Sequence, residues 1–137
     1  MRFLIKLPAA LVCAGIAVSI GAIVVQTQED LARISLKSGE SVTLRNYSFS
    51  AACQSTMIGK PTLDILEGPQ ELSFTLKEGP VIRRDQGCSK PVPGGDVVAT
   101  AKEIKEAKEA RLTIRLNYMT KNGPRQSASV YLVSLFP

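Results

Sequence analysis

The side chains best suited to chemistry in this sequence are its cysteines. Cys13 falls in an apolar N-terminal segment, and Cys53 and Cys88 follow it. Two cysteines in an exported domain permit one pairing, so we predict a disulfide between Cys53 and Cys88. Their spacing is not the C-x-x-C of redox-active pairs, which favours a structural bond. Closing a loop of this length stabilises a domain by roughly 3.5–4 kcal/mol in the chain-entropy description.

A basic cluster flanks the second of these cysteines. Arg83, Arg84 and Lys90 lie close to Cys88 in sequence, so the disulfide would hold them in place. An anchored group of cations can contact a phosphate, a carboxylate or an acidic polysaccharide. We therefore mark the three basic residues as a candidate anion or partner contact. The alternative is a solvated loop in which Asp85 neutralises part of the charge.

Histidine and tryptophan are absent from the sequence. Without histidine, the chain can form neither a Ser-His-Asp nor a Cys-His catalytic set, and it has no histidine ligand for a metal. Asp64, Glu67 and Glu71 are close in sequence and could form an acidic edge, but they lack the loop spacing of a calcium site. We predict no catalytic, cofactor-binding or metal site.

The first 28 residues have the form of an export signal. Arg2 and Lys6 precede residues 7–25, which carry no charge. A basic start and an apolar stretch are typical of a secretory signal, and this stretch is nearly long enough to span a bilayer. We predict that residues 1–28 are a signal peptide or, alternatively, an uncleaved anchor helix in the inner membrane. In both cases residues 29–137 lie in the periplasm or are secreted.

Alternating apolar residues dominate the exported part, which is the pattern of β-strands. Leu72, Phe74 and Leu76 alternate with polar residues, and residues 111–118 alternate even more regularly. Such strands bury one face and belong to antiparallel sheets. Weaker strands are expected at residues 32–36, 41–49, 62–66, 80–83 and 97–101. Seven or eight short strands with evenly spaced turns predict an all-β antiparallel sandwich over residues 29–137.

The C-terminal hairpin can be predicted in register. Residues 121–123 end in a glycine and fit a three-residue loop with that glycine in the left-handed region. This loop places Leu116 opposite Ala128, whereas a two-residue Asn-Gly turn places it opposite Ser129. Burial of matched apolar pairs favours the three-residue loop. Residues 130–136 are apolar on both faces, which predicts a strand in a central position or at a partner interface.

Turn residues predict the remaining connections. Residues 67–70 predict a hairpin that folds residues 62–66 back onto residues 72–76. Two prolines and two glycines predict a loop at residues 90–95. Residues 101–110 have high helix propensity but one large apolar side chain. We expect one or two helical turns there or, alternatively, an exposed crossover.

Residues 93–136 carry a family resemblance. They consist of PGGDVVATAKEI, a charged crossover, ARLTIRLNYMTKNG and a returning strand. This order resembles the last strands of bacterial exported immunoglobulin-like and fibronectin type III-like modules, and the whole chain is similar to small exported bacterial proteins. The resemblance implies an immunoglobulin-like sandwich. It implies no function, because function depends on a site and not on a fold.

Charge and composition narrow the expected function. The net charge is +5, but acidic residues are interspersed with the basic ones, so nucleic acid is not an expected partner. We expect a non-enzymatic envelope module that binds or scaffolds an envelope protein or an anionic surface polymer, without a cofactor. Strand addition at an exposed edge is an expected contact mode. The alternative is a small secreted enzyme inhibitor or a hydrolase that uses carboxylates alone.

Overall fold

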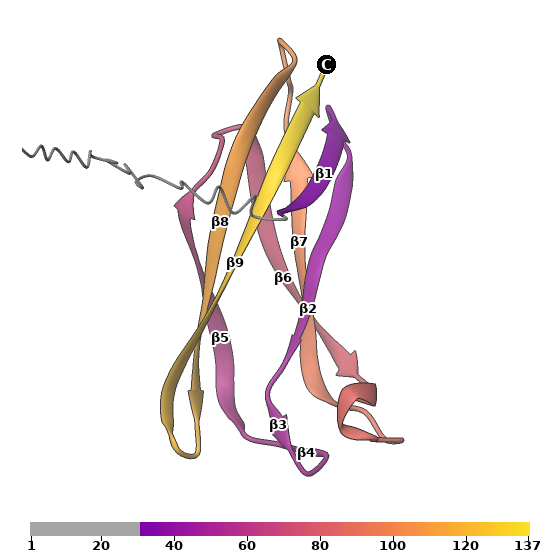
Figure 1. Ribbon diagram of the computed structural model, residues 1–137, viewed down its shortest axis with the longest axis vertical. Coiled ribbons are helices and arrows are strands. Elements are labelled where there is room, and N and C mark those ends of the chain that lie inside the picture. Colours follow the sequence, from indigo (N-terminus) through magenta and orange to yellow (C-terminus); the bar gives the residue numbers. More distant parts are fainter. Residues whose placement is uncertain (1–30) are drawn as a thin grey trace, which may run out of the picture. The chain divides into compact units, whose positions relative to one another are not determined.

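Nine strands and one short 3-10 helix make up residues 31–137, the part of the chain that the computed structural model describes (Figure 1). The strands are β1 (Ala32–Lys37), β2 (Ser41–Ser48), β3 (Ser50–Ala51), β4 (Gln54–Ser55), β5 (Met57–Glu67), β6 (Leu72–Val81), β7 (Val92–Ala101), β8 (Lys108–Thr120) and β9 (Gly123–Phe136), and the helix is η1 (Arg84–Gln86). The all-β prediction is confirmed for this part of the chain. However, β5, β8 and β9 have 11, 13 and 14 residues, so the prediction of short strands is wrong for them. The predicted signal peptide or anchor of residues 1–28 lies outside the described residues.

The strands form two main sheets, and the short strands β3 and β4 pair with each other. The first sheet has the order β1-β9-β8-β5 and the second has the order β2-β7-β6 (Figure 1). Neighbouring strands run antiparallel except for β1, which runs parallel to β9. β9 thus has the central position in its sheet that its apolar sequence predicts. No helix in residues 31–137 combines the length and the apolar character needed to cross a membrane.

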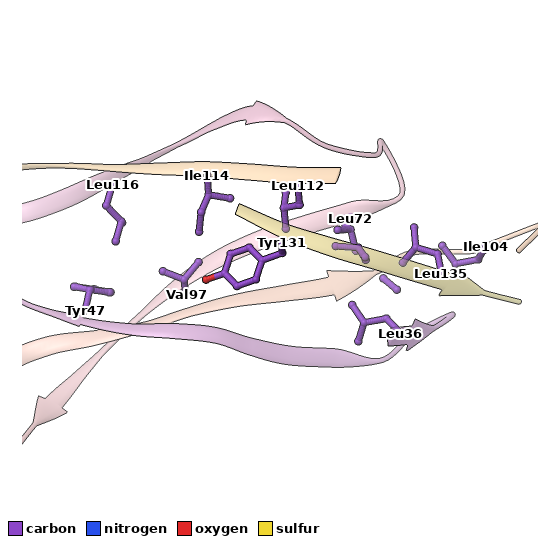
Figure 2. Packing of buried hydrophobic residues seen from close by; sticks show 12 residues of the cluster. Leu36, Tyr47, Leu72, Val97, Ile104, Leu112, Ile114, Leu116, Tyr131 and Leu135 are labelled. Atoms are coloured by element: carbon purple, nitrogen blue, oxygen red, sulfur yellow. The ribbon is translucent and has the colours of Figure 1, made fainter. Parts of the chain in front are cut away.

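The inner faces of the two sheets share one apolar core (Figure 2). Leu112, Ile114 and Leu116 alternate along β8 and are at most 1% exposed, as the period-two pattern predicts. Val97 of β7 and Tyr131 of β9 belong to the same cluster. Full burial of one such apolar side chain is worth about 1.5–3 kcal/mol, so the contact between the sheets is the main source of stability.

The β8–β9 hairpin has a two-residue loop, and the predicted three-residue loop is wrong. Thr120 pairs with Gly123, and the register places Leu116 opposite Ser127 instead of Ala128. The alternative Asn-Gly turn does not give this register either. A shift of one residue exchanges the faces of a strand, so the inner face of β9 consists of Ser127, Ser129, Tyr131, Val133 and Leu135.

Two of these inward residues, Ser127 and Ser129, explain why the apolar match failed. A hydroxyl that faces the core without a partner costs about 1–3 kcal/mol. Arg45 of β2 prevents this cost, because its Nη1 donates to both serine hydroxyls at 3.0 Å. The polar cross-link between the sheets permits a register that apolar pairing alone disfavours.

β5 and β6 do not form the predicted hairpin. β5 pairs with β8 and β6 pairs with β7, so residues 68–71 carry the chain from one sheet to the other. Gly68 makes this crossing compact, since a Cβ atom there would lie 2.9 Å from Cδ1 of Leu112. Glycine and proline indicate a reversal of the chain but not whether the flanking strands pair or pack across layers.

β7 begins at Val92, so the predicted loop of residues 90–95 ends earlier than expected. Gly94 and Gly95 lie in the strand beside Tyr47, which is 2% exposed. A Cβ atom at Gly95 would approach the Tyr47 hydroxyl to 2.6 Å. The two glycines therefore permit close packing against the backbone and the ring of Tyr47 instead of forming a turn.

Residues 102–107 connect β7 to β8 without a helical turn. Of the two conformations expected for this stretch, the crossover is the one observed. Ile104 is 3% exposed and packs in the core. Its N–H donates to Oγ of Ser38 at 2.8 Å. Burial of one apolar side chain outweighs the helix propensity of its charged neighbours, because so short a helix is unstable by itself.

Candidate functional site

Three connections between strands lie at one end of the two-sheet domain (Figure 1). We call this end the basic end; it comprises residues 49–56, 82–91 and 121–125. Backbone hydrogen bonds join its parts: the Thr56 N–H donates to the Phe49 carbonyl at 2.8 Å, and the Lys121 N–H donates to the Thr56 carbonyl at 3.1 Å. The β8–β9 hairpin and the connection from β2 to β5 therefore form one surface.

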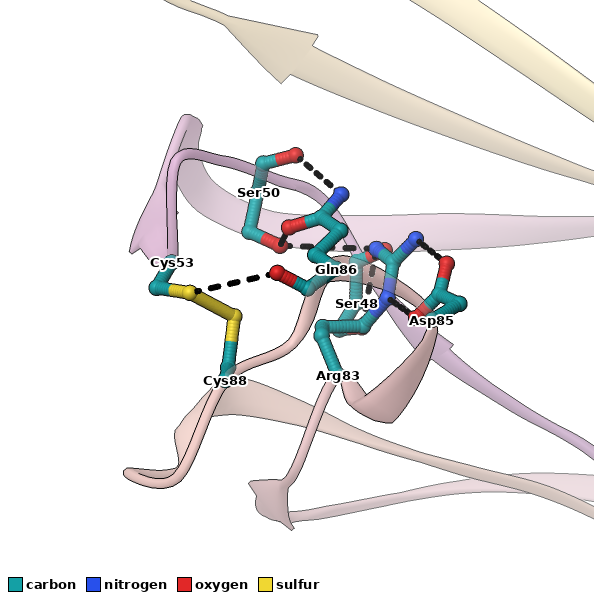
Figure 3. Close-up of a disulfide and its surroundings, with 7 residues drawn as sticks. All are labelled: Ser48, Ser50, Cys53, Arg83, Asp85, Gln86 and Cys88. Carbon is teal, nitrogen blue, oxygen red and sulfur yellow. Dashed lines mark hydrogen bonds and ion pairs between the residues drawn. A yellow bond between two sulfur atoms is a disulfide. The ribbon is translucent and has the colours of Figure 1, made fainter.

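The disulfide joins two of these connections (Figure 3). Cys53 follows β3 and Cys88 follows η1, and the two residues are bonded as the sequence predicts. Ala52 and Cys53 have φ angles of 51° and 63°, a left-handed conformation that costs a residue with a Cβ roughly 1–2 kcal/mol. The turn between β3 and β4 is thus locally unfavourable. Its bond to Cys88 holds it in place.

Arg83 fastens the same two connections through its guanidinium (Figure 3). Nε and Nη2 donate to the Asp85 carboxylate at 2.9 and 2.7 Å, and Nη1 donates to the Ser48 carbonyl at 3.1 Å. These hydrogen bonds lower the pKa of Asp85 and raise the pKa of Arg83. Ser50 and Gln86 exchange two further hydrogen bonds of 2.9 and 3.0 Å. Arg83 therefore cross-links the two connections, and its guanidinium already forms hydrogen bonds with Asp85 and Ser48.

The other members of the predicted basic cluster are exposed. The side chains of Arg84 and Lys90 form no ion pair or hydrogen bond within residues 31–137. The structure adds Lys121 and Arg125, both exposed, from the β8–β9 hairpin. These two residues are far from Cys88 in sequence and join the cluster only when the chain folds. Asp85 is the only acidic residue in the three connections.

A groove of about 380 Å³ opens beside the hairpin. Its lining includes Phe49 and Tyr118, whose rings stack on each other, the polar side chain of Asn122, and the two arginines Arg83 and Arg125. Both rings are half-buried. Aromatic rings beside cations suit a ligand that has both an apolar surface and a negative charge.

The carboxylates that are close in sequence do not form a common site. Asp64 accepts hydrogen bonds from Arg115 at 2.8 Å and from Asn117 at 2.7 Å, which lower its pKa. Glu71 pairs with Lys108 at 2.7 Å, and this bond lowers its pKa as well. No group of three or more cysteine and acidic side chains within residues 31–137 is placed to hold a metal ion.

The opposite end of the domain has a different composition. We call it the mixed-charge end; it comprises residues 38–40, 68–71 and 102–107. Its charged residues are Glu40, Glu71, Lys102, Glu103, Lys105 and Glu106. Backbone bonds close it, since the Gly39 N–H donates to the Ala101 carbonyl at 2.9 Å and the Lys102 N–H donates to the Glu71 carbonyl at 2.7 Å.

Comparison with known proteins gives no relative: no family model, no curated protein and no solved structure matches this chain. The basic end must therefore be interpreted from its own chemistry. Of the predicted site residues, the structure brings Cys53, Cys88 and Arg83 together in one cross-linked region. Arg84 and Lys90 belong to the same connection and remain exposed.

Proposed function

We propose that this protein is an exported, non-enzymatic binding module of the cell envelope, and that its basic end binds an anionic surface polymer. The composition of the basic end carries this proposal. It has five cations and one carboxylate, which is already paired with Arg83. Clustered cations attract a polyanion at long range, and guanidinium groups bind its carboxylates or phosphates through paired hydrogen bonds.

Two observations support export. Arg2 and Lys6 precede the uncharged residues 7–25, as in a secretory signal. The domain also contains a disulfide, and such bonds persist in oxidising compartments. We infer that the protein acts in the periplasm or outside the cell, either released by cleavage or held to the inner membrane through residues 7–25.

The proposed scaffold is an immunoglobulin-like sandwich. The strand orders β9-β8-β5 and β2-β7-β6 correspond to the two sheets of that fold, and β1 adds to the first of them. In immunoglobulin variable domains, connections at one end of the sandwich form the binding surface. The basic end consists of such connections, including the one between β8 and β9.

Three carboxylates support a non-enzymatic role. Asp64, Glu71 and Asp85 all have pKa values lowered by basic or amide partners, whereas a carboxylic general acid requires a raised pKa.

One observation favours an enzyme inhibitor as the second candidate. Residues 82–91 form a surface connection fixed at Cys88 and Arg83, and a rigid loop is the usual contact of a protein inhibitor.

The proposal can be tested with immobilised polygalacturonate, a polymer of uniform negative charge, and with neutral dextran. The double variant Lys121→Gln, Arg125→Gln removes two cations from the basic end. The matched control Lys102→Gln, Lys105→Gln removes two exposed cations from the mixed-charge end. We expect the first variant to weaken polygalacturonate binding by about tenfold and the control by less than about twofold, since clustered cations act together on a polyanion.

Salt provides the second measurement. Binding should weaken as the salt concentration rises, because screening shortens the range of the attraction. Equal losses for the two double variants would show that net charge alone governs binding. That outcome, or equal binding to dextran, would contradict the assignment of the site to the basic end.

A further inference from the structure

Within residues 31–137, one edge of β9 is unpaired over half of its length. β8 pairs with β9 from Gly123 to Leu135, but β1 pairs only with Tyr131 to Phe136. Among residues 31–137, no strand pairs with the other edge of residues 124–130. We call this side of residues 126–130, which lie outside the basic end, the open edge.

The open edge presents backbone hydrogen-bonding groups. Because Thr120 and Gly123 close a two-residue loop, the odd-numbered residues of β9 direct their N–H and C=O groups toward β8 and the even-numbered residues direct theirs away. The bond from the Ser38 N–H to the Phe136 carbonyl, 3.1 Å long, agrees with this alternation. Gln126 and Ala128 are exposed, so their N–H and C=O groups are available to another strand.

The other sheet edges carry features that hinder strand addition. β5 has a bulge and contains Pro61, and β6 contains Pro80. β2 is bulged, and β1 presents the exposed charges of Arg33 and Lys37. By contrast, residues 126–130 contain no proline and no charge, and they pair with β8 without a bulge. Among the sheet edges of residues 31–137, the open edge is the one without such protection.

A cation that has no carboxylate partner among residues 31–137 lies beneath the open edge. Arg45 is half-buried, and its Nη1 donates to the hydroxyls of Ser127 and Ser129, both at 3.0 Å. Its Nε donates to the Asn46 carbonyl at 3.2 Å. Within residues 31–137 it forms no ion pair. Because hydrogen bonds between ions are stronger than those to hydroxyls, this guanidinium favours a carboxylate brought next to the serines.

We propose that the open edge accepts an extended segment of a partner protein as an added strand, with an aspartate or glutamate of that segment above Arg45. Backbone bonds to Gln126 and Ala128 supply the affinity, and the carboxylate supplies the selectivity. This site is separate from the basic end. Strand addition and polymer binding can therefore be tested separately.

The test uses isotope-labelled protein purified after export and a short peptide of alternating threonine and valine with one central aspartate. A second peptide has asparagine in place of the aspartate. We expect the aspartate peptide at saturation to slow amide exchange of Gln126 and Ala128 by at least about tenfold, because added strand bonds protect these groups. The asparagine peptide should bind about five- to tenfold more weakly, as one charge-assisted hydrogen bond predicts.

Two variants locate the site. Ala128→Pro removes an N–H group from the open edge but no bond to β8, so it should abolish peptide binding and leave the fold intact. A peptide with a methylated backbone gives the same test without altering the protein. Arg45→Gln should remove the preference for aspartate over asparagine. The control Arg33→Gln removes an exposed cation on β1 and should preserve this preference.

The outcomes separate the possible occupants. Unchanged exchange at Gln126 and Ala128 would overturn the proposal, as would binding that survives Ala128→Pro. Equal affinity for the two peptides would overturn the role of Arg45. Concentration-dependent self-association that Ala128→Pro abolishes would assign the open edge to a second copy of the chain instead of a partner segment.

Discussion

Backbone hydrogen bonds join the connections of both the basic end and the mixed-charge end, but the side chains that fasten the two ends differ. At the basic end, the Cys53–Cys88 disulfide and the side chain of Arg83 join the connections. At the mixed-charge end, backbone hydrogen bonds and the buried side chain of Ile104 do so. Charge follows the same division, because the basic end has five cations and one carboxylate, whereas the mixed-charge end has two cations and four carboxylates. Fastening by side chains leaves a surface whose exposed charges remain available to a ligand.

Loss of the disulfide should have the largest effect, and it should affect the basic end more than the mixed-charge end. We expect Cys53→Ser combined with Cys88→Ser to lower the free energy of unfolding by about 4 kcal/mol. The thermal midpoint should fall by more than about 10 °C. Amide exchange should accelerate more in residues 82–91 than in residues 102–107. An unchanged midpoint, or free thiols at both cysteines in native material, would contradict this account of the basic end.

Removal of the apolar anchor should have the next largest effect, at the opposite end. Ile104→Ala leaves a cavity in the core and should lower the free energy of unfolding by about 2–4 kcal/mol. Its neighbour Lys105 is exposed, so the control Lys105→Ala should stay within about 0.5 kcal/mol of the unmodified protein. Denaturant unfolding measures both values. If the two variants are equally stable, Ile104 does not anchor the mixed-charge end.

A glycine pair tests how closely β7 packs where it leaves the basic end. Gly95→Ala places a methyl group against the Lys77 carbonyl and the Tyr47 hydroxyl and should cost about 1–3 kcal/mol in overpacking. Gly79→Ala is the matched control, since nothing lies within 4 Å of a Cβ atom there. We expect its thermal midpoint to remain unchanged or to rise slightly. A midpoint equally lowered in both variants would point to backbone effects instead of contact with Tyr47.

We expect low pH to have the smallest effect, and to act on the stability of each end separately. The pKa of Asp85 lies below its ordinary value of 3.8, so its stabilising contribution is complete above that pH and is lost as the pH falls below it. Glu71 behaves in the same way at the mixed-charge end, below its ordinary pKa of 4.5. Asp85→Asn should therefore reduce the acid sensitivity of exchange in residues 82–91, and Glu71→Gln should reduce it in residues 102–107. A uniform change across the domain would contradict this local coupling.

The sequence predicted the features that depend on local patterns. The inner face of β8 follows from the alternation of Leu112, Ile114 and Leu116, and the disulfide follows from the two cysteines that come after the apolar N-terminal segment. The register of β9 did not follow, because it depends on Arg45, a residue far away in the sequence. For the same reason, the stacking of Phe49 on a ring of β8 had no local signal.

The turn residues predicted where the chain reverses, but they did not predict which of the two sheets the next strand joins. The crossing from β5 to β6 and the strand at Gly94 and Gly95 depend on contacts with residues that are distant in sequence. The basic end was found only in part for this reason. Arg83, Arg84 and Lys90 are neighbours in sequence, whereas Lys121 and Arg125 reach the same end through the β8–β9 hairpin.

The parallel pairing of β1 with β9 has a mechanical consequence. These are the first and last strands of the described chain, and they run side by side in the same direction over six residue pairs. A pulling force applied between Leu31 and Pro137 is therefore directed along both strands. It loads their hydrogen bonds simultaneously in shear and does not peel them apart one after another. The parallel pairing of the first and last described strands therefore makes β1 and β9 the element that resists stretching first.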